Sequence, residues 1–376
     1  MRIVAAGRRG RGAGRDVAPV GIGIIGCGFA AAKLHLPALR ALREAKIVAA
    51  ADLDRSRLTQ VADRFGIPMR SEDFRLVLDN PAVDAVAVCV PPAAHTAVTL
   101  AALEAGKHVL VEKPLALSLD DCDRLIERAA RSDRVVTVGF NMRWHRLVRR
   151  ARTILAQGIL GRLSLLRSVF TSGSRFEERY QPWRARREQG GGVLTEFGVH
   201  HYDLWRFLLD SEVEEVFAMA GGGSATVTGR MASGVLVEAG FSEITGGRNE
   251  FDLFGAAGQL HLSCYRFDGL EVAGIRELYP GSPAIRLRRL GRLIRELPES
   301  VPAMRRGGDH IDSYRAEWLH FLAAIRGGRS AGAALLDGRR ALEVALAALE
   351  SAATGRPVAC GRAPRALTLL SGHEGA

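Results

Sequence analysis

The sequence predicts an α/β domain with a parallel sheet, followed by an α+β domain with an open, mostly antiparallel sheet. Over residues 20–141, short apolar runs alternate with helix-length amphipathic segments, which is the pattern of β-α-β units. After Asn141 the expected strands become longer and polar at alternate positions, without a helix between each pair, as in a half-exposed antiparallel sheet. A chain of 376 residues is long enough for two such domains.

The first half is expected to form five strands, each a nearly continuous apolar run that suits a sheet covered by helices on both faces. These are residues 20–25, 46–51, 84–90, 108–111 and 134–138. Helices are expected to begin at Ala30, Arg55 and His95, and after Ser118 as N-cap. We therefore expect a disordered tail over residues 1–19, a Rossmann domain over 20–141 and the second domain over 142–376.

In the second half, strands are expected at residues 162–171, 212–219, 225–240 and 249–263, and helices at 193–209, 312–326 and 337–353. Helices on one face of an antiparallel sheet make this domain α+β. The last helix is a candidate to pack back on the first domain. The amphipathic pattern of residues 285–297 favours a solvated or subunit-facing helix over a membrane anchor.

Composition narrows the class of protein. The net charge is +11, but the arginines are spread along the chain without interleaved aromatic residues, so we expect no nucleic-acid partner. No apolar stretch approaches the roughly 18 residues that a membrane span needs. The five cysteines are scattered and form no C-x-x-C pair, which indicates neither disulfides nor a metal site and fits a reducing, cytoplasmic location.

A glycine pattern, Gly26-x-Gly28-x-x-Ala31, lies between the first expected strand and helix. The first glycine can make the tight turn and the second lets the backbone approach a pyrophosphate, which the N–H groups around Phe29 and Ala30 would bind. Asp52 ends the second expected strand, where a carboxylate accepts hydrogen bonds from a ribose hydroxyl and repels a 2′-phosphate. The pattern predicts NAD as cofactor.

Two features leave parts of this cofactor site open. Arg55 and Arg57 follow the second strand closely, so NADP is also possible. Pro91 and His95 are candidates for the floor under the nicotinamide, although His95 has an alternative interpretation as a helix-start residue that satisfies backbone groups.

The tripeptide Glu112-Lys113-Pro114 follows the apolar run 109–111, at the strand end where ligands bind in open α/β sheets. Lysine is rare here, with four residues among 52 Lys plus Arg. A lysine can lose its proton when desolvated, which an arginine effectively cannot, so Lys113 suits proton handling. The alternative is a solvated loop residue that pairs with Glu112.

A second polar group is expected on the helix over residues 193–209. Glu196, His200 and Asp203 are spaced i, i+4 and i+7 and would share one face, whereas His201 would point elsewhere. A histidine near neutral pKa can take an alcohol proton while a carboxylate orients its ring. The alternatives are polar pairing beside a core histidine and, less favoured, a metal site that includes His201.

Several motifs together resemble the glucose-fructose oxidoreductase / inositol dehydrogenase / rhizopine-catabolism (Gfo/Idh/MocA) family. They are Gly23-x-x-Gly26-x-Gly28, Pro91-Pro92-x-x-His95, Glu112-Lys113-Pro114, Gly139-Phe140-Asn141-x-Arg143, Gly190-Gly191-Gly192-Val193-Leu194, Glu317-Trp318-x-x-Phe321 and Asp337-Gly338. The resemblance covers nearly everything except the N-terminal tail and residues 265–305.

The resemblance implies an NAD(P)-binding Rossmann domain, a C-terminal sheet used in oligomers, and oxidation or reduction of sugars and cyclitols. The family's catalytic lysine, acid and histidine map onto Lys113, Glu196 and His200. Glu196 departs from the usual Asp of members similar to inositol dehydrogenase, which puts its precise role in doubt.

These expectations combine into one hypothesis: an NAD(P)-dependent dehydrogenase acting on a secondary hydroxyl of a sugar or cyclitol, as a homodimer or homotetramer. The candidates for the substrate pocket are Arg143, Trp183, Arg184 and Asp203. The alternatives are an NADPH-dependent ketoreductase of a nucleotide- or antibiotic-linked sugar, a non-catalytic NAD-sensing regulator, and a glycoside-cleaving enzyme that uses NAD transiently.

Overall fold

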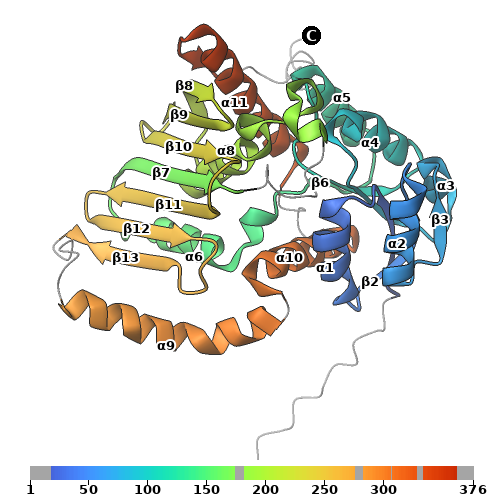
Figure 1. The fold of residues 1–376 in the computed structure, drawn as a ribbon, viewed down its shortest axis with the longest axis horizontal. Coiled ribbons are helices and arrows are strands. Elements are labelled where there is room, and N and C mark those ends of the chain that lie inside the picture. The colour runs from blue at the N-terminus through green and yellow to red at the C-terminus, as the bar shows by residue number, and fades with distance from the viewer. Residues whose placement is uncertain (1–17, 174–181, 276–282, 306, 328–332, 362–376) are drawn as a thin grey trace, which may run out of the picture.

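The structure is a computed structural model that describes residues 18–173, 182–275, 283–305, 307–327 and 333–361. All but the last two residues of the predicted tail, 1–19, therefore lie outside the described residues. The chain forms two sheets, each with its own layer of helices (Figure 1). Both predicted architectures are confirmed.

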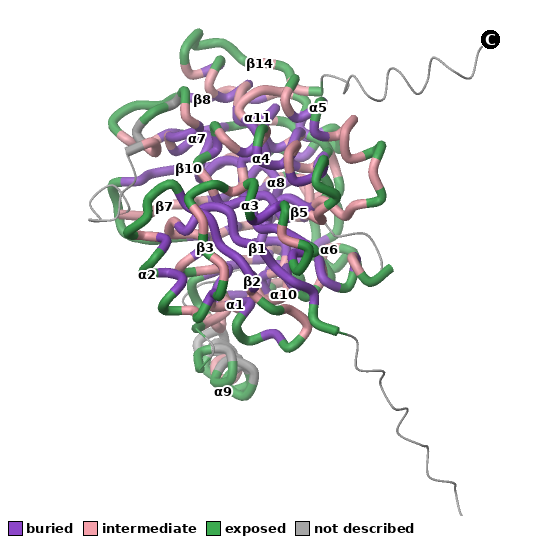
Figure 2. The backbone as a smooth tube through the Cα atoms, turned by 90° about the vertical axis from the view of Figure 1, so that its right-hand side faces the viewer, coloured by how far each residue is buried: buried purple, intermediate pink, exposed green. Residues whose placement is uncertain are grey.

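The first sheet has the strand order β3-β2-β1-β4-β5-β6, and each neighbouring pair runs parallel. Its strands are β1 (Val20–Ile25), β2 (Ala45–Ala51), β3 (Met69–Ser71), β4 (Ala85–Val88), β5 (His108–Val111) and β6 (Val136–Val138). Both β1 and β4 are buried along their whole length, as expected of strands covered on two faces. Figure 2 shows β1 and β2 buried under the surrounding helices.

The helices between these strands begin at or within one residue of the four predicted starts, and α1 and α3 are additional. They are η1 (Ala31–His35), α1 (Leu36–Arg40), α2 (Arg55–Phe65), α3 (Phe74–Asp79), α4 (His95–Glu104) and α5 (Leu119–Ala130). The Ser118 hydroxyl accepts a hydrogen bond from Asp121 N at 3.1 Å, so the predicted N-cap is confirmed. Sequence analysis missed β3 and α3, which are too short to show a period.

The second sheet has the order β13-β12-β11-β7-β10-β9-β8-β14. Its neighbours pair antiparallel, except that β7 and β10 run parallel. The strands are β7 (Leu163–Thr171), β8 (Val213–Gly221), β9 (Ser224–Met231), β10 (Leu236–Ser242), β11 (Arg248–Gly255), β12 (Gly258–Ser263), β13 (Leu270–Gly274) and β14 (Val358–Ala359).

Two predicted strands were wrong because each contains a reversal. The expected strand 225–240 is the hairpin of β9 and β10, which turns through Gly234 at a φ of +81°. The expected strand 249–263 is the hairpin of β11 and β12, which turns at Ala256 and Ala257. Alternation of apolar and polar residues continues through such short turns, so the period alone does not reveal them.

Two helices that follow residue 141 pack against the first sheet as well as the second domain. The last helix, α11 (Leu335–Thr354), packs on β8 and also on α5 and β6. A Cβ atom on Gly338 would lie 2.9 Å from side-chain carbons of Leu115 and Val138, which shows how closely α11 approaches the first sheet. Helix α10 (Gly308–Ile325) buries Trp318 and Phe321 in the core around β1.

Helix α9 (Pro283–Arg305) includes the amphipathic segment predicted at 285–297 and lies along the outside of the fold (Figures 1 and 2). Its apolar residues Leu287, Leu290 and Ile294 are more than half exposed. None of the helices in the described part of the chain combines the length and apolar character needed to cross a membrane.

Candidate active site

The loop after β1 has the shape that the glycine pattern predicts. Gly26 has a φ of +92°, and a Cβ there would lie 2.6 Å from the backbone of Cys89, so a glycine is required. No atom lies within 4 Å of where a Cβ on Gly28 would be, whereas Ala31 is buried. Open space over Gly28 at the start of a helix leaves the backbone accessible, which fits a pyrophosphate group.

Asp52, directly after β2, is tied to this loop. Its Oδ2 accepts hydrogen bonds from Cys27 N at 2.7 Å and from Arg57 Nε at 3.0 Å, and its Oδ1 accepts from Arg57 Nη2 at 2.7 Å. Burial raises the pKa of Asp52, but the hydrogen bonds from Arg57 and from backbone N–H groups outweigh it, so the pKa lies below its ordinary value. The carboxylate is ionised at the edge where a ribose would lie.

His95 joins two loops at the carboxyl edge of the sheet. Its Nδ1 lies 2.7 Å from the carbonyl oxygen of Pro114, and its Nε2 lies 2.9 Å from that of Val90. Burial lowers the pKa of His95, although both carbonyl contacts favour the protonated ring. His95 is the first residue of α4, but its side chain holds the loops and not the helix N–H groups. Pro91 beside it is exposed at the same edge.

Glu112 is buried and bound from two sides. Trp318 Nε1 donates to His35 Nδ1 at 3.1 Å, which leaves His35 Nε2 to donate to Glu112 Oε1 at 2.8 Å. The backbone N–H of Lys113 donates to Glu112 Oε2 at 3.1 Å. Burial raises the pKa of Glu112, but the hydrogen bond from His35 and the charge of Lys113 bring it below its ordinary value.

The Lys113 side chain extends toward the second domain. Its Nζ donates to the carbonyl oxygen of Glu196 at 3.2 Å, so the alternative of a solvated residue paired with the Glu112 side chain is wrong. The side chain is half-buried. Burial lowers the pKa of Lys113, and the nearby charges of Glu196 and Glu112 offset only part of this effect. A lysine in this setting loses its proton more readily than a solvated one.

The predicted helix 193–209 is in fact two helices, α7 (Val193–Glu196) and α8 (Gly198–Leu209), which meet at Phe197. The predicted pairing of Glu196 with His200 is also wrong. Glu196 Oε1 forms an ion pair with Arg184 Nη2 at 2.9 Å, and His200 Nδ1 is buried without a hydrogen-bond partner in the described structure. Glu196 reaches Lys113 through its backbone and Arg184 through its side chain.

His200 and His201 have the different environments that the helical spacing predicts. Burial, followed by the charge of Lys113, lowers the pKa of His200 well below its ordinary value, so the ring is neutral at pH 7. His201 is fully buried, with Nε2 3.3 Å from Asn249 Oδ1 and its ring stacked on Phe170. His201 is therefore a core residue.

Arg143 and Asp203 were predicted to line the substrate pocket, but the structure buries them together. Arg143 Nε donates to Asp203 Oδ2 at 2.7 Å, and Arg143 Nη1 donates to Asp337 Oδ2 at 3.0 Å. Burial raises the pKa of Asp203, although the charge of Arg143 opposes this. These ion pairs link the end of the first half to α8 and α11, so both side chains are occupied in holding the fold and the prediction that they line the substrate pocket is wrong.

Trp183 and Arg184 remain beside the other candidates. Both are half-buried, and the Arg184 guanidinium lies 5.7 Å from the centre of the Trp183 ring. A Cβ on Gly191 would lie 2.1 Å from the carbonyl oxygen of Arg184, so the glycine run allows this segment to pack closely before α7. Arg184 thereby reaches Glu196.

Sequence analysis missed His310 on α10. His310 is exposed at the surface, and its charge lowers the pKa of His200, while Glu112 raises the pKa of His310 against the larger effect of desolvation. A single histidine near the start of a distant helix gave no signal that it would lie near residues 112 and 200.

Together, a parallel sheet with a glycine loop, an ionised acid at the end of its second strand and a second sheet domain define a dinucleotide-binding oxidoreductase. Residues 20–140 match the family model described as "Oxidoreductase family, NAD-binding Rossmann fold", and residues 148–261 match the "GFO/IDH/MocA C-terminal domain". The chain belongs to the Gfo/Idh/MocA family of oxidoreductases.

Two of the relatives to which the chain is similar are named as inositol dehydrogenases. The chain is similar to the myo-inositol 2-dehydrogenase of Thermotoga maritima, with 32% identity over 197 residues, which are 52% of this chain and 57% of that enzyme. It is 28% identical to the scyllo-inositol 2-dehydrogenase (NAD(+)) of Bacillus subtilis over 322 residues, which are 84% of this chain and 88% of that enzyme.

A solved structure shares the fold over most of the chain. Levoglucosan dehydrogenase in complex with NADH and levoglucosan matches with a TM-score of 0.74 at 20% identity, over 92% of this chain and 100% of that one. At this identity the likeness shows the fold alone.

Proposed function

We propose that the protein transfers a hydride between a nicotinamide cofactor and a secondary hydroxyl or ketone of a sugar or cyclitol. The observation that carries this proposal is the meeting of Lys113 with α7 and α8. Lys113, which is half-buried and has a lowered pKa, contacts the carbonyl of Glu196, and Glu196 lies four positions before the neutral His200. Proton transfer to and from a reacting oxygen requires such a pair of titratable groups.

The roles follow from the protonation states. The neutral His200 accepts the proton of the substrate hydroxyl, and the Lys113 ammonium donates a hydrogen bond to the same oxygen as negative charge develops there. Arg184 neutralises Glu196, which leaves the carbonyl of Glu196 to orient Lys113. A nicotinamide held by the glycine loop and Asp52 would supply the acceptor for the hydride of the substrate carbon.

NAD is the proposed cofactor. The ionised Asp52 carboxylate accepts hydrogen bonds from ribose hydroxyls and repels a 2′-phosphate. Arg57 is already bound to both carboxylate oxygens of Asp52, so its guanidinium is not available to a 2′-phosphate.

The proposed location is a reducing, cytoplasmic setting, which suits the free thiol form of all five cysteines.

A panel of polyols, aldoses and cyclitols, each assayed with NAD and with NADP by absorbance of the reduced cofactor, tests the proposal. We expect turnover with at least one cyclitol or sugar and a preference for NAD. Tight NAD binding without turnover on any member would favour the NAD-sensing regulator. Product formation without net reduced cofactor would favour glycoside cleavage, and turnover only of a nucleotide-linked ketosugar with NADPH would favour the ketoreductase.

Replacing Lys113 with Ala is the most direct test of the site. We expect kcat to fall by about a hundredfold or more, because the hydrogen bond to the developing negative charge is lost. The affinity for NAD, measured by titration calorimetry, should stay within about threefold of the native value. Lys107→Ala is the matched control, since Lys107 binds backbone carbonyls away from this site. Unchanged kcat in Lys113→Ala would refute the assignment.

A further inference from the structure

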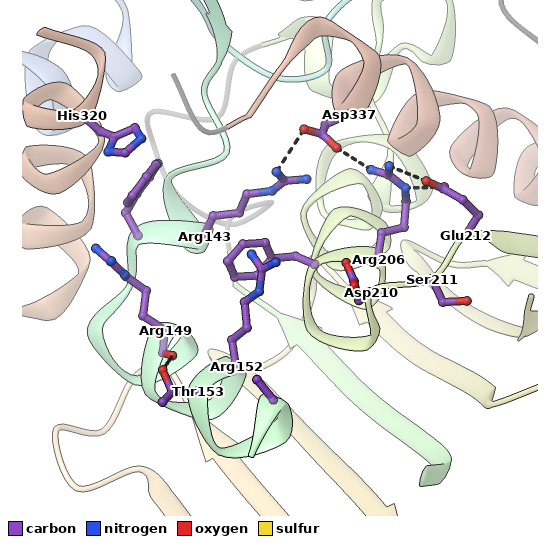
Figure 3. A pocket seen from close by; sticks show the side chains of 13 residues that line it. Arg143, Arg149, Arg152, Thr153, Arg206, Asp210, Ser211, Glu212, His320 and Asp337 are labelled. Carbon is purple, nitrogen blue, oxygen red and sulfur yellow. Dashed lines mark hydrogen bonds and ion pairs between the residues drawn. The ribbon is translucent and has the colours of Figure 1, made fainter. Parts of the chain in front are cut away.

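A cavity of about 780 Å³ lies at the far end of α8 from His200 (Figure 3). It is lined by the turn η3 (Asn141–Trp144), by α6 (Arg146–Ala156), by the end of α8, and by single residues of α10 and α11. Because α8 rises about 1.5 Å per residue, Asp210 at its end lies roughly 15 Å along the axis from His200. The cavity is therefore distinct from the candidate active site.

The inner wall of the cavity is electrically balanced. Arg206 Nη1 donates to Asp337 Oδ1 at 3.0 Å, and Arg206 Nε donates to Glu212 Oε2 at 2.6 Å. Arg143 binds the other oxygen of Asp337 at 3.0 Å (Figure 3). Each of these charges has an opposite partner, so this wall has no need of a ligand.

The outer wall is not balanced. Arg149 and Arg152 are spaced i, i+3 on α6, and both extend to the cavity (Figure 3). Neither guanidinium forms an ion pair with any residue in the described parts of the chain, whereas Arg146 on the same helix binds Asp309 at 3.1 Å. Like charges on one helix repel, and an anion bound in the cavity would offset this repulsion.

Aromatic rings hold the two arginines in place. The Arg152 guanidinium lies 4.0 Å from the centre of the Phe207 ring, and that of Arg149 lies 5.4 Å from the Trp144 ring. Such stacking occupies the guanidinium face and leaves its N–H edge available, which is the geometry that favours bidentate binding of phosphate. The ring contacts restrict two exposed side chains, which lowers the entropy cost of ordering them around a ligand.

The remaining lining indicates what carries the phosphate. The volume falls within the roughly 300 to 1,000 Å³ of small-molecule sites and is several times that of a phosphate ion. The centre of the Trp144 ring lies 4.2 Å from that of His320, and the Arg143 guanidinium lies 5.2 Å from the centre of the Phe207 ring. Neither ring is therefore free to stack on a nucleobase. Asp210 on the rim forms no ion pair within the described residues and can accept hydrogen bonds from hydroxyl groups.

We propose that this cavity binds a phosphorylated polyol, with its phosphate at the wall that carries Arg149 and Arg152 and its hydroxyl groups toward Asp210. The site goes beyond the proposed dehydrogenase activity, because it shares no residue with the candidate active site.

Titration calorimetry on the full chain with saturating NADH, which keeps phosphate out of the dinucleotide loop, tests the proposal. The probes are glucose 6-phosphate, inorganic phosphate and glucose. We expect glucose 6-phosphate to bind, inorganic phosphate to bind more weakly and glucose not to bind. Absence of binding by both phosphates would overturn the site, and equal affinity for the two would overturn the polyol part of the proposal.

Variants locate the binding. Arg149→Gln and Arg152→Gln should each raise the Kd for glucose 6-phosphate about tenfold or more, because each removes a charged hydrogen-bond donor. Arg150→Gln is the matched control, since it removes the same charge from the same helix outside the cavity, and it should leave the Kd unchanged. Equal effects of all three variants would reduce the interaction to net charge and overturn the proposal.

Two further results separate this site from the active site. Lys113→Ala should keep native affinity for glucose 6-phosphate, and loss of binding in that variant would contradict the proposed location. Thermal unfolding of each variant checks that the fold is retained, so that weaker binding by Arg149→Gln or Arg152→Gln reports on the site.

Discussion

Four ionisable side chains at the candidate site form two pairs that differ in what dominates their pKa shifts. Asp52 and Glu112 both have pKa values below the ordinary value because hydrogen bonds outweigh burial, so both remain ionised. Lys113 and His200 have lowered pKa values because burial dominates. Carboxylates therefore carry the fixed charge, and the lysine and histidine are the groups whose protonation can change during a reaction.

The pH dependence of activity follows from these directions. A lowered pKa keeps His200 unprotonated until the pH falls below the ordinary value of about 6.5, so kcat/KM for oxidation should hold down to at least that pH. Because the pKa of Lys113 is lowered, its ammonium deprotonates on the alkaline side at a pH below the ordinary value of about 10.4, and activity should fall there. A profile from pH 5 to 10.5 checks both limbs. An acid limb above pH 7 would contradict the role of His200.

Cofactor choice belongs to the same scale. In Asp52→Ala the hydrogen bonds to the ribose are lost and Arg57 is released from its partner. We expect the KM for NAD to rise about tenfold and the ratio of NADP to NAD activity to increase. Asp63→Ala, on the exposed face of α2, removes the same charge and should change neither value. If both variants behave alike, Asp52 does not select the cofactor.

Among the elements, α11 joins the two halves of the molecule. The helix lies on β8 and also reaches β6 through Gly338, where no side chain fits. Its buried Arg339 donates to Asp123 Oδ1 of α5 at 2.7 Å, which fixes the rotation of the helix against the first half. The relative position of the two sheets therefore depends on the packing of one face of α11.

Gly338→Ala tests this contact. The new methyl group would lie 2.9 Å from two buried side chains, and such overpacking should lower the free energy of unfolding by about 1 to 3 kcal/mol. Gly240→Ala on β10 is the control, because nothing lies within 4 Å of its Cβ position. Urea denaturation of both variants measures the difference, and equal stability would show that α11 adjusts at no cost.

The success of sequence analysis differed between local and distant contacts. The parallel strands, the glycine loop and the N-cap at Ser118 depend on neighbours in sequence, so they could be predicted. The ion pair of Arg184 with Glu196, the break at Phe197 and the burial of Asp203 by Arg143 depend on residues brought together only by the fold. Helical spacing predicted that Glu196 would lie near His200, but it could not show that Arg184 would form an ion pair with Glu196 instead.

At the scale of the whole molecule, the helices among the described residues leave one face of the second sheet uncovered (Figure 1). On β10, Val237 and Ala239 are buried against the helices, whereas Leu236 is 55% exposed on the opposite face, and Met219 on β8 is 65% exposed. Apolar side chains on an open sheet face favour association with a second copy. The expected homodimer or homotetramer stays a prediction.

Light scattering coupled to size exclusion tests this expectation. The native chain should elute as a dimer or tetramer, and a Leu236→Glu, Met219→Glu double variant should be monomeric, because two charges would be buried at the contact. Leu290→Glu on the exposed stripe of α9 is the comparison and should leave the assembly intact. A monomeric native chain would refute the prediction, and dissociation by Leu290→Glu would move the interface to α9.

The central strand β7 has a consequence for how the chain is made. Both strands that pair with it, β10 and β11, come after α7 and α8 in sequence. In the first half, the His35 ring that binds Glu112 is itself oriented by a hydrogen bond from Trp318, which comes 283 positions later in the sequence. During synthesis, the first core cannot close until Trp318 has left the ribosome, and the second core also includes buried residues of α11 from the last fifth of the chain. A chain interrupted before α10 would carry the glycine loop and Lys113 yet lack the tryptophan that orients the support of Glu112.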